Sequence, residues 1–240
     1  MDQTSLAARL QTYARKSNAA PPRHFGTRYD ASGTFLPEPG NTVVCHLMPG
    51  TETDRALADA RQRYLDMPEA RQLAFTPLSS LHMTLFQGII EYRRTEGYWP
   101  ADVPLATPIE DMTAILAQRV AGFSPGPAFQ MKVVEALPTG LTLEGATEAD
   151  RRALMDWRNR LADLFGYRHP DHDTYVFHIT FAYVTDWFDE EALARWHAML
   201  DEVAKDIQRR APVLELKPPA FCSFEDMNHF EELIVLPVSG

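Results

Sequence analysis

The stretch SSLHMTLFQG, residues 79–88, places a histidine and a threonine two positions apart within a run of apolar side chains. A second stretch, YVFHITFAYV at residues 175–184, has the same arrangement. Short apolar runs bounded by polar or turn-forming residues predict buried β-strands. Side chains two apart on a strand point to the same face, so each histidine shares a face with its threonine.

The two predicted polar faces carry the same pair of chemical groups. His82 lies beside Thr84 and His178 beside Thr180, and we expect both faces to meet across a cleft. Imidazole titrates at about pH 6.5, so one ring can accept a proton while the other donates one. A threonine hydroxyl can donate to a non-bridging phosphate oxygen as its charge grows. The pattern favours phosphoryl chemistry by general acid–base catalysis, with no metal ion and no cofactor.

The rest of the chain predicts the same strand–helix–strand order in each half. Apolar periodicity, Thr51 or Thr53 as a helix cap, and a capping box at Thr147 and Asp150 define most of these elements. The predicted strands are 42–48, 81–90, two within 129–145, 175–184, and three terminal candidates at 213–217, 220–226 and 233–238. The predicted helices are 4–16, one ending at about 66, 109–120, 147–165, and 188–209 capped by Asp186.

This order predicts an α+β fold that is duplicated and bilobal. We expect two antiparallel-rich sheets flanked by helices, with a central cleft that carries one histidine–threonine motif from each lobe. Residues 1–240 then form one bilobal domain, and whether the terminal strands cross between lobes stays open. Its parts are an N-terminal helix and loop-rich extension at 1–41, a first lobe at 42–120 and a second lobe at 121–240.

Composition limits the partners of the protein. The net charge of -10 disfavours a long nucleic acid, because binding by counterion release needs a basic surface. A small phosphorylated nucleotide or a short RNA end remains compatible with a local positive site. Cys45 and Cys222 lack metal-type spacing and are expected to be reduced. Neither a signal peptide nor an apolar run of about 20 residues is evident, so a cytoplasmic monomer without membrane contact is expected.

The sequence resembles the two-histidine (2H) phosphoesterase superfamily, which includes proteins similar to RNA 2′,5′-ligases and cyclic phosphodiesterases. Both HMTL (82–85) and HITF (178–181) match its H-x-[ST]-x-hydrophobic motif, and the likeness extends over about residues 42–240. The resemblance implies a duplicated fold with a cleft, catalytic roles for His82, Thr84, His178 and Thr180, and opening or hydrolysis of a cyclic phosphate or related phosphodiester. The chain looks closest to a bacterial and fungal branch without an assigned function.

Two loops carry further candidate substrate-binding residues. In the 91–108 loop, arginine side chains are suited to phosphate and aromatic rings to stacking on a base. These candidates are Arg93, Arg94, Tyr98 and Trp99, together with Arg28 and Tyr29 of the N-terminal extension. Strand parity places Tyr183 on the apolar face, so we expect no role for it in the site. We expect the other histidines, His24, His46, His197 and His229, to be structural or surface residues.

Two alternatives compete with the metal-independent enzyme. The segment RHPDHD contributes His169 and His172, which with His178 would form the centre of a metal-dependent hydrolase, because imidazoles and carboxylates are suitable ligands. The second alternative is a binding module that recognises a nucleotide in the same cleft without turning it over.

Overall fold

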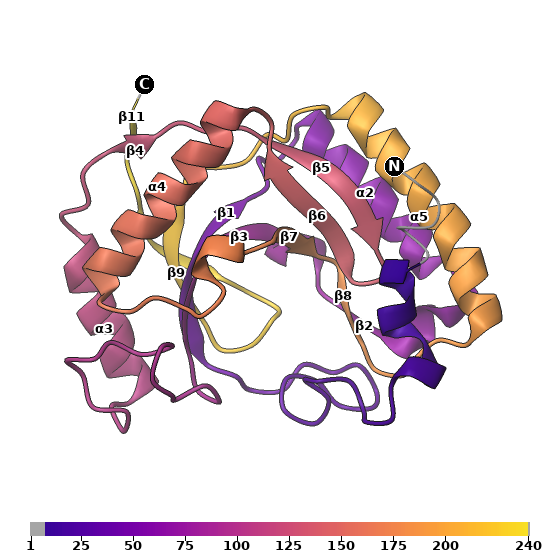
Figure 1. Ribbon diagram of the computed structural model, residues 1–240, viewed down its shortest axis with the longest axis horizontal. Helices are drawn as coiled ribbons and strands as arrows, with labels where there is room; N and C mark the ends of the chain where they lie inside the picture. Colours follow the sequence, from indigo (N-terminus) through magenta and orange to yellow (C-terminus); the bar gives the residue numbers. More distant parts are fainter. Residues whose placement is uncertain (1–7, 240) are drawn as a thin grey trace.

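A seven-stranded antiparallel sheet forms the centre of the computed structural model, which describes residues 8–239 (Figure 1). Its strand order is β10-β9-β1-β3-β7-β6-β5, and two further sheets pair β2 with β8 and β4 with β11. The strands are β1 (Gly40–His46), β2 (Leu73–Phe75), β3 (His82–Ile90), β4 (Gly126–Pro127), β5 (Met131–Leu137), β6 (Gly140–Gly145), β7 (Phe177–Thr180), β8 (Ala182–Val184), β9 (Ala220–Phe224), β10 (Glu231–Val235) and β11 (Val238–Ser239). The helices are α2 (Glu52–Leu65), α3 (Ile109–Val120), α4 (Glu148–Phe165) and α5 (Glu190–Arg210).

The α+β class is confirmed, but the prediction of two separate sheets is wrong. The two motif strands, β3 and β7, are neighbours in one sheet, where Met83 lies opposite Ile179. We call these two residues the central pair. Each strand satisfies backbone groups that would otherwise stay unpaired at a sheet edge, which is the physical reason for joining the two halves. The proposed division into lobes stays a prediction.

The helix boundaries follow from capping side chains. The hydroxyl of Thr51 accepts a hydrogen bond from the Asp54 amide and begins α2. Thr147 and Asp150 form the predicted capping box of α4. The cap of α5 is Asp189, whose carboxylate accepts from the Ala192 amide at 2.7 Å. The prediction of Asp186 as this cap is wrong.

The carboxylate of Asp186 is occupied elsewhere. It accepts from the Trp187 amide at 2.9 Å and forms an ion pair with Arg15 at 2.6 Å. Asp186 therefore lies just outside the helix and connects the segment before α5 to the N-terminal part of the described chain.

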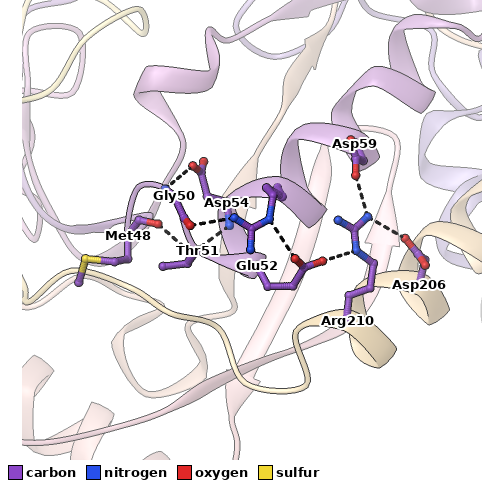
Figure 2. A network of polar contacts seen from close by, with 9 residues as sticks. Met48, Gly50, Thr51, Glu52, Asp54, Asp59, Asp206 and Arg210 are labelled. Carbon is purple, nitrogen blue, oxygen red and sulfur yellow. Dashed lines mark hydrogen bonds and ion pairs between the residues drawn. The ribbon is translucent and has the colours of Figure 1, made fainter.

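The helices form two pairs beside the sheet. In Figure 1, α3 and α4 lie on the left, and α2 and α5 lie side by side on the right. Figure 2 shows how an ion-pair network joins the second pair. The Arg210 guanidinium, near the end of α5, donates to Glu52 at 2.6 Å and to Asp59 at 2.7 Å, both on α2. The same side chain lies 3.4 Å from Asp206, one turn earlier on α5.

The predicted strand at 175–184 is broken at Phe181. Its amide donates to the Thr139 carbonyl at 2.9 Å, and its carbonyl accepts from the Thr76 amide at 2.9 Å. These bonds lead the chain out of the main sheet, so that β8 pairs with β2 and not with β3. The break explains why strand parity fails for residues beyond Thr180.

The ends of the chain depart further from the sequence prediction. The helix expected at 4–16 lies partly outside the described residues, and residues 8–10 are helical before two short 3₁₀ turns at Gln11–Tyr13 and Arg15–Ser17. The 213–217 candidate forms only isolated bridges, whereas 220–226 and 233–238 contribute to β9 and to β10 and β11. Of the helices in residues 8–239, none has the length and apolarity that crossing a membrane requires.

Replacing Gly140 with alanine is expected to lower the free energy of unfolding by about 2–4 kcal/mol. Gly140 has a φ of 139°, and an added Cβ would lie 2.1 Å from the Ile179 carbonyl oxygen and 2.9 Å from the Phe181 nitrogen. Both neighbours are backbone atoms of the second motif, so no flexible side chain can yield. Urea denaturation followed by circular dichroism measures the change.

Gly122→Ala is the matched control, because its Cβ would meet no atom within 4 Å. We expect this control to change the free energy of unfolding by less than about 0.5 kcal/mol. Equal destabilisation by the two variants would contradict the argument.

Candidate active site

The two motifs converge on one pocket. His82, Thr84, His178 and Thr180 all line it. Continuing the antiparallel register from the central pair places each histidine opposite the threonine of the other motif, His82 opposite Thr180 and Thr84 opposite His178. Opposite side chains lie roughly 5 Å apart at their Cβ atoms and residues two apart on one strand about 7 Å, so the two histidines lie at diagonally opposite corners of a rectangle.

A bulge in β3 adds a further polar side chain to this face. Val43 pairs with Phe86 and Val44 with Thr84, so one extra residue is inserted between them. Leu85 and Phe86 are both buried, and the alternation is shifted by one position beyond them. Gln87 consequently lines the pocket, although simple parity from His82 would place it on the opposite face.

The two catalytic candidates are held in the same way. Nδ1 of His82 lies 2.6 Å from the Ser80 carbonyl oxygen, and Nδ1 of His178 lies 3.1 Å from the Val176 carbonyl oxygen. A carbonyl oxygen can only accept, so Nδ1 carries the proton in both rings. Each neutral ring therefore keeps the lone pair of Nε2 for a proton from a substrate or water.

Burial disfavours the charged form of both rings. It lowers the pKa of His82 to about 3, with the bond to Ser80 opposing and the nearby His46 and His178 rings adding to the shift. The Phe230 ring lies 4.2 Å from the His82 ring and forms part of this apolar cover. Desolvation by the surrounding protein atoms also lowers the pKa of His178, with the bond to Val176 opposing, while its side chain stays exposed to solvent in the pocket.

The pocket is positively charged in a protein that is acidic as a whole. Arg23, Arg28 and Arg93 line it, and none of its described lining residues is an aspartate or a glutamate. Arg28 forms an ion pair with the buried Glu38 and lies 5.1 Å above the Tyr183 ring. Such surroundings favour an anionic ligand.

Two of the six candidate substrate-binding residues line the pocket, Arg28 and Arg93. Arg94 instead pairs with Glu91 and donates to two backbone carbonyls of its own loop. The Tyr98 ring packs against Arg93 and His169, so it reaches the site only through Arg93.

The remaining two candidates are core residues. Trp99 is 3% exposed, and Arg94 lies 5.0 Å above its ring. Tyr29 is 2% exposed and donates its hydroxyl to the Val184 carbonyl at 2.7 Å. The prediction that these two side chains contact the substrate is not supported, because neither lines the pocket.

Several pocket residues were missed from the sequence. Tyr183 lines the pocket, so its predicted place on the apolar face is wrong; the break at Phe181 changes the direction of its side chain. His24 also lines the pocket, and the His46 ring lies 5.9 Å from that of His82 across β1 and β3. Tyr175 and Phe230 complete the aromatic wall, and no local sequence signal marks either of them.

The metal-centre alternative is not supported by the geometry. His169 and His172 are 3% and 1% exposed and pack their rings against Phe86. His172 also lies 3.0 Å from the Asn159 side-chain oxygen, whereas His178 stands in the pocket. Across residues 8–239, no three histidine, cysteine or acidic side chains converge as a metal-binding group.

Fold and site together define an α+β protein with a two-histidine pocket, and comparison with known proteins identifies its family. The family model 2H-phosphodiest, Domain of unknown function (DUF1868), matches residues 28–142, a range that includes the first motif. The chain is also similar to the crystal structure of the conserved protein of unknown function ATU0111 from Agrobacterium tumefaciens str. C58. The two share 54% identity over 95% of this chain and 98% of that chain, with a TM-score of 0.94.

The chain therefore belongs to this 2H-phosphodiesterase family, which confirms the resemblance seen in the sequence. No curated protein matches the chain. Membership of the family indicates phosphoesterase activity, and the solved relative is itself described as a protein of unknown function.

Replacing the buried His169 with phenylalanine is expected to flatten the dependence of stability on pH. Burial, with Arg93, Arg158 and His172 nearby, lowers the pKa of His169 to about 3. The unfolded chain, with a pKa of about 6.5, binds the proton first, so stability is lost as pH falls from about 6.5 towards 3. The variant should reduce this slope by up to about 1.4 kcal/mol per pH unit.

Urea unfolding at a series of pH values between 7 and 4 measures the slope. His229→Phe, which removes an exposed histidine, is the matched control for the loss of one titratable group. A wild-type slope in the His169 variant would show that this ring is not held neutral in the folded protein.

Proposed function

We propose that the protein is a metal-independent phosphoesterase that hydrolyses the cyclic phosphate, or a related phosphodiester, of a small nucleotide or short RNA end. The observation that carries the proposal is the shared pocket, in which two histidines with equivalent backbone contacts face two threonines, and whose lining within residues 8–239 includes no aspartate or glutamate. A phosphodiester is an anion, so a pocket with three arginines and no carboxylate in its described lining suits it.

The proposed reaction uses the free Nε2 atoms in turn. One histidine, neutral at the start, takes a proton from water as the water oxygen attacks phosphorus. The other, protonated, gives its proton to the ribose oxygen that leaves as the P–O bond breaks. The products are a phosphomonoester and a free hydroxyl, and exchange with solvent returns both rings to their starting states.

Burial supports His82 as the base. Its ring is covered by Phe230 and neighbours a second imidazole, His46, and these surroundings disfavour the charged form. The ring of His178 is open to water in the pocket, where the negative charge of a bound phosphate would favour its protonated form. Thr84 and Thr180 would donate to the non-bridging oxygens, where negative charge develops in the transition state.

His82→Ala and His178→Ala should each lower kcat on a 2′,3′-cyclic nucleotide by roughly 10²- to 10⁴-fold, because each removes a proton-transfer group. Thr84→Ala and Thr180→Ala should lower kcat by up to roughly 10²- to 10³-fold. Steady-state kinetics over a pH series should give a bell-shaped wild-type profile. Residual activity in either histidine variant should lack one limb of the bell.

His197→Ala is the control, since His197 lies on α5 outside the pocket. Full activity in either motif-histidine variant would overturn the mechanism. Two further outcomes would support one of the alternative functions. Loss of activity with a chelator would favour a metal-dependent hydrolase. Tight nucleotide binding without turnover of any cyclic phosphate would favour a binding module.

A further inference from the structure

We propose that the pocket contains a second anion subsite, formed by Arg93 with Arg23 and Arg28 beside it, which holds a non-reacting phosphate of the substrate. The inference deepens the proposed function and rests on it, because it assumes that a phosphodiester occupies the motif residues. It narrows the substrate to nucleotides that carry one phosphate on the 2′,3′ side of the ribose and another on the 5′ side.

Arg93 is a partly buried cation without a counterion. Its guanidinium donates to the Gln87 side chain at 3.1 Å and to the Gly88 carbonyl at 3.0 Å, and it lies 4.5 Å above the Tyr98 ring. All of these partners are neutral, and within residues 8–239 no carboxylate forms an ion pair with it. Its buried Nε–H also lacks an acceptor there. Removing a cation from water without a counterion is costly, and a bound anion would offset that cost.

Two further arginines add to this positive charge. Arg28 forms an ion pair with Glu38, whose negative charge offsets the positive charge of Arg28. Arg23 is an exposed residue of the pocket lining and has no ion-pair partner in the described chain. Their proximity is evident at His24, which lies among the three arginines. Burial lowers the pKa of His24 to about 4, and Arg28, Arg23 and Arg93 each contribute to the shift.

The arginine group lies away from the motif residues. Arg93 donates to Gln87, which lies three residues beyond Thr84 on β3. Three residues of a regular strand span about 10 Å, and the bulge between Thr84 and Gln87 makes the separation shorter than that. The pocket therefore has two polar ends, one with the motif residues and one with guanidinium groups.

This spacing fits a nucleoside with phosphates on both sides. Two phosphates bound at ends that lie up to about 10 Å apart leave room for one ribose between them. Guanidinium groups bind phosphate through paired N–H donors, and the threonines at the other end suit the single charge of a phosphodiester. Tyr183 lines the same pocket, and its ring packs against Arg28 beside this end.

The experiment measures binding, so that it does not depend on turnover. Calorimetry compares adenosine 3′-phosphate with adenosine 3′,5′-bisphosphate, and adenosine 2′-phosphate with adenosine 2′,5′-bisphosphate. We expect wild-type protein to bind at least one bisphosphate roughly 10- to 100-fold more tightly than its monophosphate, the range of charge-assisted hydrogen bonds. Arg93→Gln should bring this ratio close to one, and Arg93→Lys, which keeps the charge, should retain part of it.

Arg152→Gln is the matched control, since this arginine is exposed on α4, pairs with Glu148 and does not line the pocket. It should keep the wild-type ratio, and thermal unfolding should show that every variant is folded. Equal wild-type affinity for the members of both pairs, an unchanged ratio in Arg93→Gln, or no binding of any of the four nucleotides would overturn the subsite. Hydrolysis of 2′,3′-cyclic nucleotides tests the proposed function separately, so the two failures are distinguishable.

Discussion

The pairing of β3 with β7 at Met83 and Ile179 is the constraint on which the site depends. Both central residues are fully buried, so they fix which face of each strand points to the core. Side chains alternate between the two faces of each strand, and the two strands run antiparallel. The residues directly before and after the central pair on both strands therefore point to the face of the sheet opposite the core. A shift of one residue in this register would turn one motif into the core and expose its apolar face. The four motif side chains are therefore positioned by a hydrophobic contact that itself has no part in the chemistry.

Much of this arrangement could be predicted from the sequence because its causes are local. Alternation of apolar and polar residues identified the two motif strands, and a threonine followed three residues later by an aspartate marked the start of α4. The motif faces were also assigned correctly, since strand parity needs no knowledge of the partner strand. What parity could not show is that the two strands are direct neighbours in one sheet. Pairing between residues almost 100 positions apart depends on the whole fold, and no short window of sequence contains it.

Gln87 and Tyr183 could not be predicted as site residues, because the backbone near each of them departs from a regular strand. The bulge near Leu85 and Phe86 turns Gln87 into the pocket, and Gln87 in turn holds Arg93. The break at Phe181 does the same for Tyr183. The break is held by backbone hydrogen bonds to Thr76 and Thr139, and at the bulge the side chains of Arg158 and Thr42 donate to the Leu85 and Phe86 carbonyls. These partners are distant in sequence, so hydrophobic periodicity does not reveal either irregularity. The histidine-rich loop shows the opposite error: His169 and His172 resembled metal ligands in sequence, yet aromatic packing against Phe86 explains their presence.

The charge of the whole chain and the charge of its pocket have opposite signs. The chain carries a net charge of -10, while the described lining of its pocket includes three arginines and no carboxylate. Long-range repulsion from an acidic protein weakens binding of an extended polyanion, whose many phosphates meet the whole surface. A small nucleotide enters the pocket and meets mainly the local arginines, because protein walls exclude the screening solvent. The same charge distribution that opposes a long nucleic acid is therefore compatible with selection for a compact, multiply charged nucleotide.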